Sequence, residues 1–147
     1  MIKKFQEISN TVIAEFLARW MLGILFLMAG YWKVFVLTPA KHAENFFIKG
    51  FEVHWIPEWL LWALGLSIPV LELAAGLALL AGLWRKLTLT SVGLLLLLTT
   101  YGHALQQPLF DIDGHTFTRF VLVIFLLMLP SSTVFLTVDS WISSRKS

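Results

Sequence analysis

The residues in this sequence that could do chemistry are a few charged side chains inside long apolar stretches. Glu72 lies near the middle of the run from Ser67 to Lys86, and Arg19 and Lys33 lie inside an earlier apolar run. An ionised side chain at bilayer depth costs at least about 2 kcal/mol unless it is protonated, paired or in a wet cavity. The helices around Glu72 must therefore supply it with a partner.

Arg19 is the preferred partner for Glu72. Arg19 lies about six residues from the cytoplasmic end of its expected span and Glu72 about eleven from that end of its own, a difference of roughly 7 Å at 1.5 Å per residue. A long guanidinium side chain can close that distance. We therefore predict an intramembrane Arg19–Glu72 ion pair that fixes helix register. Glu15, four residues before Arg19, also has the spacing of an intrahelical pair.

A second polar group is expected near the opposite ends of the spans, where Lys33, His103 and Arg119 lie. A quinone headgroup needs hydrogen-bond donors for its carbonyl oxygens and a proton route, and these side chains beside aromatic walls could provide both. The alternative is that Arg19 and Glu72 only fix helix register, with His103 simply interfacial and Lys33 extending to the headgroups.

A metal site is a further alternative. It would use His103, Asp111, Asp113 and His115, whose imidazole and carboxylate groups suit zinc, iron or manganese if they converge. The Asp-Ile-Asp-Gly-His string lacks the regular spacing of a ligand loop, and acids and histidines in loops are ordinarily solvated. A metal is therefore not favoured.

The composition indicates an integral membrane protein. Of 147 residues, 58% are hydrophobic and 14% charged, whereas soluble domains have roughly 45–50% apolar and 25% charged residues. No cysteine is present, so disulfide relays, iron–sulfur clusters and Cys-ligated zinc are excluded and no covalently bound cofactor is expected. The small net charge of +2 argues against a nucleic-acid partner. Neither a nucleophile–base arrangement nor a phosphate-binding loop is recognisable.

The elements that must position these side chains are four membrane-spanning helices. A span needs about 20 mainly apolar residues, and the sequence predicts spans at about 13–36, 58–83, 87–105 and 116–138. Pro130 gives the last span an alternative end at about residue 129. Residues 38–57 are too polar to span and are rich in aromatic residues, which predicts an interfacial segment. The fold expected for residues 1–147 is a single all-α domain, a four-helix membrane bundle.

The basic residues predict the orientation of this bundle. Lys3, Lys4, Arg85 and Lys86 fall on one side, which places both termini in the cytoplasm of a bacterial inner membrane. The first apolar run is long and contains Arg19, so it is expected to remain as a helix and not to be removed as a signal peptide.

The ordered charged and glycine residues of this chain resemble those of the DoxX family of membrane proteins. The similar positions are Arg19, Gly23, Phe26, Ala29, Gly30 and Lys33, then Glu72, Gly76, Gly82 and Arg85, then His103, and finally Thr137, Val138 and Asp139. The resemblance implies a four-helix membrane bundle, and some relatives are membrane subunits of quinone-linked oxidation of sulfur compounds. The long aromatic first loop and the polar third loop depart from the family pattern.

Three functions follow as hypotheses. The first is a small membrane subunit or partner of a redox system, linked to quinone, that is not an enzyme by itself. The second is a noncatalytic membrane anchor or assembly protein, which would use its aromatic loop and small-residue helix faces to bind a partner. The third is a small-solute transporter, which four spans could form only as an oligomer. The expected partners are the lipid bilayer and either another protein or further copies of this chain.

Overall fold

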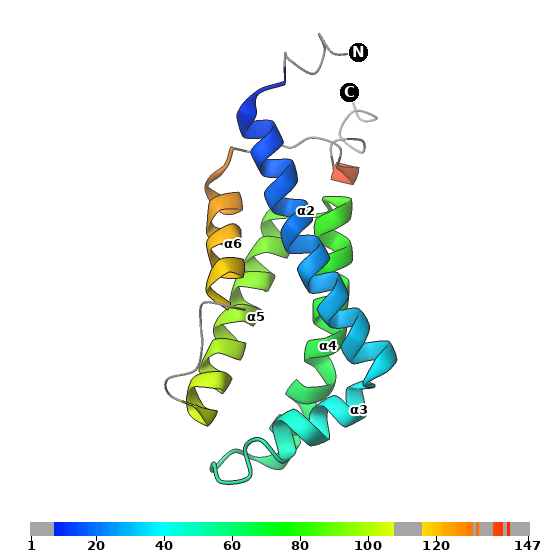
Figure 1. The fold of residues 1–147 in the computed structure, drawn as a ribbon, viewed down its shortest axis with the longest axis vertical. Coiled ribbons are helices and arrows are strands. Elements are labelled where there is room, and N and C mark those ends of the chain that lie inside the picture. Colours follow the sequence, from blue (N-terminus) through cyan, green and yellow to red (C-terminus); the bar gives the residue numbers. More distant parts are fainter. Residues whose placement is uncertain (1–7, 108–115, 131, 133–136, 140, 142–147) are drawn as a thin grey trace.

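The structure, a computed structural model, describes residues 8–107, 116–130, 132, 137–139 and 141. It is a bundle in which α2 (Asn10–Tyr31), α4 (Glu58–Ala81) and α5 (Arg85–Gln106) are long and α6 (Thr118–Met128) is short (Figure 1). The described part of the chain contains helices and no strand, as the sequence predicts. Three helical stretches, Asn10–Val36, Glu58–Ala81 and Arg85–Gln106, are long and apolar enough to cross a membrane.

The segment between α2 and α4 is helical too. A π-helix, η1 (Trp32–Val36), continues α2, and the chain then turns into α3 (Pro39–His42) and a second π-helix, η2 (Ala43–Ile48). These short helices lie across the end of the bundle below α2 and against the beginning of α4 (Figure 1). Phe51, in the segment predicted to be interfacial, is only 6% exposed, because the segment folds back over the helices.

The helix ends follow from local sequence. Ser9 caps α2, since its hydroxyl accepts a hydrogen bond from the Thr11 amide at 3.3 Å. Helix α4 ends at Gly82 in the left-handed conformation, with φ of 65°. Helix α6 ends at Met128, because Leu129 precedes Pro130 and is extended, with ψ of 136°. The fourth helix therefore ends near the shorter of its two expected limits and is not continuous to residue 138.

Glycines set the close packing of α2 against α4. A Cβ atom on Gly30 would lie 2.3 Å from the Leu73 amide nitrogen, and one on Gly76 would lie 2.3 Å from that of Leu27. Only glycine allows backbones to approach so closely, as in many membrane helix pairs. In each of these contacts the two residue numbers add to 103: Gly30 faces Leu73, and Leu27 faces Gly76. A constant sum means that the two helices run antiparallel in one defined register.

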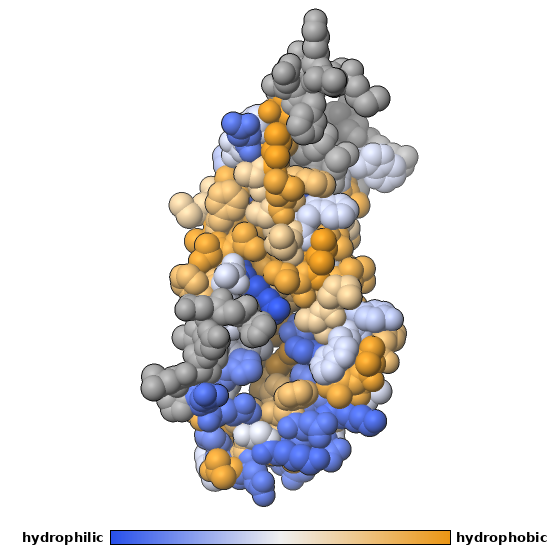
Figure 2. Space-filling view, viewed as in Figure 1, coloured by the Kyte–Doolittle hydropathy of each residue, from blue (hydrophilic) through white to orange (hydrophobic). Residues whose placement is uncertain are grey.

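The interior of the bundle is apolar and so is much of its outside. Residues that are at most 3% exposed, including Leu22, Phe26, Ile68, Val92 and Leu126, form the core. Many large apolar residues, such as Leu17, Met28 and Leu87, are more than half exposed. Figure 2 shows hydrophobic residues across the upper and middle parts of one face and hydrophilic residues gathered at the lower end. Such a surface suits lipid contact.

Candidate functional site

Lys33 and Glu72 form an ion pair between η1 and the middle of α4. The Lys33 Nζ atom lies 2.8 Å from Oε1 and 2.7 Å from Oε2 of Glu72. The Glu72 side chain is 7% exposed and that of Lys33 23%. The carboxylate is therefore removed from solvent, while its partner keeps an accessible side.

The predicted Arg19–Glu72 pair is wrong, because Glu72 pairs with Lys33 and Arg19 pairs elsewhere. The register of α2 and α4 gives the reason. With facing residue numbers that add to 103, Lys33 faces the level of residue 70, close to Glu72. Arg19 faces the C-terminal end of α4, where it donates to the carbonyls of Leu79 and Leu80, seven and eight residues or roughly 11 Å beyond Glu72. Counting from the expected helix ends misplaced the two helices relative to each other.

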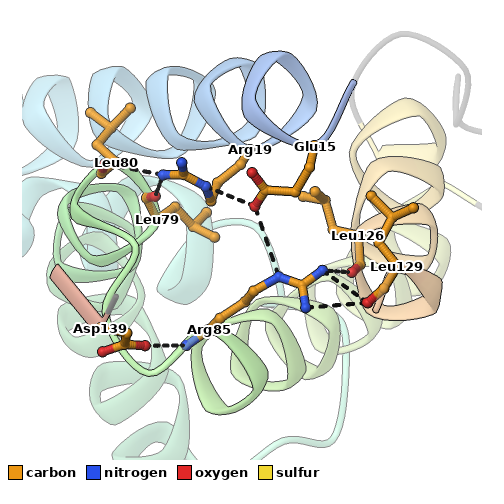
Figure 3. Close-up of polar contacts among 8 residues, drawn as sticks. All are labelled: Glu15, Arg19, Leu79, Leu80, Arg85, Leu126, Leu129 and Asp139. Carbon is orange, nitrogen blue, oxygen red and sulfur yellow. Dashed lines mark hydrogen bonds and ion pairs between the residues drawn. The ribbon is translucent and has the colours of Figure 1, made fainter. Parts of the chain in front are cut away.

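Arg19 instead belongs to a buried cluster with Glu15 at the opposite end of the bundle (Figure 3). Its Nε donates to Oε1 of Glu15 at 2.9 Å, which is the intrahelical pair that the spacing predicted, and its Nη1 donates to the carbonyl oxygens of Leu79 and Leu80 at 2.9 and 3.2 Å. Both side chains are at most 1% exposed. The guanidinium thus satisfies carbonyls at the C-terminal end of α4.

Arg85 completes this cluster from α5. Its Nε lies 3.8 Å from Oε1 of Glu15, and its guanidinium donates to the carbonyl oxygens of Leu126 and Leu129 at the end of α6. Its backbone amide donates to Asp139 at 3.4 Å (Figure 3). One side chain therefore joins the beginning of α5 to α2 and to the C-terminal end of α6, where a cation also complements the helix dipole.

A cavity of about 450 Å³ lies at the other end of the bundle, beyond Lys33. Its walls come from η1, from α3 and η2, from the turn that precedes α4, from the first half of α4 and from the second half of α5. The lining residues are Trp32, Lys33, His42, Phe46, Phe47, Phe51, Ile56, Leu60, Leu61, Leu64, Ile68, Leu98, Thr99, Tyr101, Gly102, His103, Leu105 and Gln106. The wall is mostly apolar and aromatic, with a few polar groups, as in many small-molecule sites.

Two hydrogen bonds hold the aromatic segment against the end of α5 beside this cavity. The Gln106 side chain donates to the Phe46 carbonyl at 3.2 Å, and a ring nitrogen of His54 lies 2.9 Å from the Leu105 carbonyl. Phe46 and Phe47 are cavity walls as a result. The aromatic residues of this segment therefore shape a site as well as an outer surface.

His42 is the most enclosed ionisable group of the cavity wall. It is 5% exposed, its Nδ1 lies 2.7 Å from the Gly65 carbonyl, and its ring lies 5.4 and 5.5 Å from the rings of Phe46 and Phe47. Burial lowers the pKa of His42, helped by the positive charge of Lys33 and opposed by the bond to Gly65 and by the charge of Glu72. A neutral imidazole is the form that this position favours at neutral pH.

The structure brings together two of the three residues predicted for a quinone site. Lys33 and His103 both line the cavity, with His103 at its exposed rim. Arg119 is not among the lining residues, and its guanidinium lies 5.6 Å from the Phe26 ring centroid instead. His42 was not predicted, because nothing in the spacing of an interfacial segment distinguishes it from His54.

The predicted metal ligands are only partly within the described residues. Asp111, Asp113 and His115 lie outside them, so the metal alternative stays a prediction. Within the ranges that the structure does describe, no group of three or more His, Cys, Asp or Glu side chains could hold a metal ion.

Comparison with known proteins gives one family. The model of the family described as "Methylamine utilisation protein MauE" matches residues 11–107. No curated protein and no solved structure gives a significant match. The matched segment contains all of α2 but its first residue, the elements from η1 to α5, and every residue that lines the cavity. Because the match spans more than half of the sequence, this chain belongs to the MauE family of membrane proteins.

Proposed function

We propose that this protein is a small multi-pass membrane subunit of a redox system and that its cavity binds the headgroup of a quinone. The observation that supports this proposal best is the cavity, in which Lys33, His42 and His103 stand among aromatic and aliphatic walls. Its volume of about 450 Å³ falls in the usual range for sites that enclose a small organic molecule.

Lys33 can serve as a donor to a ligand carbonyl. An ammonium group has three N–H donors. The two carboxylate oxygens of Glu72 accept hydrogen bonds from the ammonium group of Lys33. The side chain lines the cavity and keeps 23% of its surface exposed. A quinone oxygen next to it would meet a charged donor whose position Glu72 fixes.

The surroundings of the cavity suit a ligand that dissolves in the bilayer. Leu98 and Tyr101 on α5 line it and are also 41% and 66% exposed, so the wall on that side is part of the outer surface of the bundle. None of the α6 residues lines it. A headgroup could therefore enter from the side while an apolar tail remained in lipid.

The redox partner must supply the electron carriers. The chain has no cysteine, and a family described by methylamine utilisation points to oxidation of a small amine by another protein. The resemblance to DoxX proteins, carried by Arg19, Lys33, Glu72 and Arg85, favours the same kind of role. We propose that the protein lies in a bacterial inner membrane with its termini in the cytoplasm. Lys3, Lys4 and Lys86 would then lie on the cytoplasmic side, where Lys and Arg are enriched in membrane proteins.

Quinone binding to the purified chain in detergent tests this proposal. Gly102 lines the cavity, so Gly102→Leu should fill part of it and weaken binding of a short-tailed ubiquinone by about tenfold or more. Leu94→Phe on the same helix, at an exposed position outside the cavity wall, is the matched control and should bind normally. Equal affinities for wild type and His103→Ala would remove His103 from the site.

The noncatalytic anchor is the alternative, and the same preparation separates the two. A chain that recovers a partner protein but binds no quinone would be an anchor. Solute flux in liposomes that contain only this chain would instead indicate transport.

A further inference from the structure

The hydrogen bond between His42 and Gly65 fixes which nitrogen of the imidazole carries the proton. Nδ1 lies 2.7 Å from the Gly65 carbonyl oxygen, and a carbonyl oxygen can only accept, so Nδ1 must donate. In a neutral imidazole the other nitrogen, Nε2, then carries a lone pair and is a hydrogen-bond acceptor.

This Nε2 is available to a ligand. The His42 ring lines the cavity between Phe46 and Phe47, and none of the described residues forms a hydrogen bond with Nε2. The ring itself is held in place by the bond to Gly65, whose own position is tight: a Cβ atom there would lie 2.5 Å from the Ala43 Cα. The cavity therefore presents one oriented acceptor on a mostly apolar wall.

The Lys33 ammonium also lines the cavity, and it is a donor only. Lys33 can bond to an oxygen of either a quinone or a quinol, since both have oxygen lone pairs. An imidazole lone pair can bond only to a ligand that carries an O–H or N–H. The two forms of the ligand are therefore distinguished at His42 and not at Lys33.

We infer that the cavity selects the hydroxyl-bearing form of a planar apolar ligand, a quinol in preference to a quinone, and that Nε2 of His42 accepts the hydrogen bond from its hydroxyl group. This inference rests on the proposed function and specifies the form of the ligand. The lowered pKa of His42 supports it, because an imidazolium ring has no lone pair to offer.

The test compares 1-naphthol with its methyl ether, 1-methoxynaphthalene. These two planar molecules differ in one hydroxyl donor and are not redox-active under the conditions used, so binding is measured without turnover. Equilibrium dialysis of the full chain in detergent, against protein-free micelles of the same detergent, removes the difference in micelle partitioning. At about pH 7.5, wild type should bind 1-naphthol about tenfold more tightly than the ether, the effect of one buried hydrogen bond.

The variant His42→Phe keeps an aromatic ring at this position and removes the acceptor. It should bind both compounds with similar affinity, whereas Leu94→Phe, at an exposed position of α5 outside the cavity wall, should keep the preference for 1-naphthol. Equal binding of the two compounds to wild type, or an unchanged preference in His42→Phe, would overturn the inference.

A pH series provides the same test without a variant. The preference of wild type for 1-naphthol should disappear as the pH falls through the pKa of His42, because protonation converts the acceptor into a donor. The titratable groups that line the cavity with His42 are Lys33, Tyr101 and His103, and the charge of Glu72 also acts on His42. Repeating the series with His103→Ala removes the other histidine of the wall. A preference for 1-naphthol that persists at a pH where the chemical shifts of the His42 ring show it to be protonated would contradict a role for His42.

The outcomes also separate this inference from the proposed function. If neither naphthalene compound nor a short-tailed ubiquinone binds to wild type, both fail. If the ubiquinone binds and 1-naphthol binds no better than its ether, the quinone site stands and the selection of a hydroxyl group by His42 is wrong.

Discussion

Lys33 and Glu72 form a pair in which one ammonium group lies 2.8 and 2.7 Å from the two oxygens of a single carboxylate. The pair joins η1, at the end of α2, to the middle of α4, and it lies on the same helix–helix contact as Gly30 and Gly76. Charge pairing and close backbone packing therefore define one register together.

Removing the negative charge of this pair should destabilise the protein. Glu72→Gln leaves the Lys33 ammonium group without a counter-charge, and because Lys33 is partly exposed we expect a loss of about 2–3 kcal/mol in the free energy of unfolding. The double variant Lys33→Met/Glu72→Leu should lose less than Glu72→Gln, because an apolar pair leaves no buried charge. Unfolding in mixed micelles measures both, with Glu58→Gln at an exposed position of α4 as the control. A Glu72→Gln variant as stable as wild type would contradict the structural role of the pair.

Adding one methyl group at the contact of α2 and α4 should be severe. Gly30→Ala would place a Cβ atom 2.3 Å from the backbone of Leu73, so the helices must separate, and we expect a loss of at least about 3 kcal/mol or failure to accumulate. Gly93→Ala is the matched control, because its Cβ atom would lie 3.5 Å from a Val123 methyl group, an ordinary contact. It should be neutral or slightly stabilising, since alanine favours helix more than glycine does. Similar melting temperatures for the two variants would show that the close approach is not required.

Arg85 should control the attachment of α6. Arg85→Lys replaces a guanidinium that donates to both Leu126 and Leu129 with a single ammonium group, so the last turn of α6 should open more often. Amide hydrogen exchange in that turn should become about tenfold faster, as expected for the loss of a charged hydrogen bond. The neighbouring exposed Lys86, replaced by alanine, should leave exchange unchanged. Equal exchange in Arg85→Lys and wild type would place the attachment elsewhere.

Stability should fall at mildly acidic pH because of His42. In the unfolded chain this histidine takes up a proton near its ordinary pKa of 6.5, whereas in the folded protein burial lowers that pKa. Just below pH 6.5 the unfolded state therefore binds more protons than the folded state. The stabilisation that the neutral ring gives to the folded state is complete above that pH and is lost as the pH falls toward the folded-state pKa. Melting temperatures at about pH 7.5 and about pH 5.5 should differ less in His42→Phe than in wild type. An equal difference in the two proteins would rule out His42 as the source.

The features that the sequence predicts well are those that depend on neighbouring residues. The apolar runs locate the long helices, and the spacing of Glu15 and Arg19 predicts their ion pair. Each of these depends on residues within a few positions of one another, which local geometry determines directly.

The features that it does not predict depend on how distant segments meet. The partner of Glu72 is set by the register of α2 against α4, which the contacts of Gly30 and Gly76 define and which counting from helix ends does not. His42 becomes part of the cavity only because α3 and η2 fold back against α4 and place its ring beside Gly65. Neither relationship has a signature in the spacing of single helices.

The contact between α2 and α4 also determines which parts of this molecule can move. A slip of one helical turn, about 5.4 Å, would separate Lys33 from Glu72 and Arg19 from the carbonyls of Leu79 and Leu80. These two helices must therefore behave as one rigid body. If the cavity widens to admit a ligand, the parts that move must be the second half of α5 and the segment of α3 and η2. The hydrogen bonds of Gln106 and His54 join this segment to the end of α5.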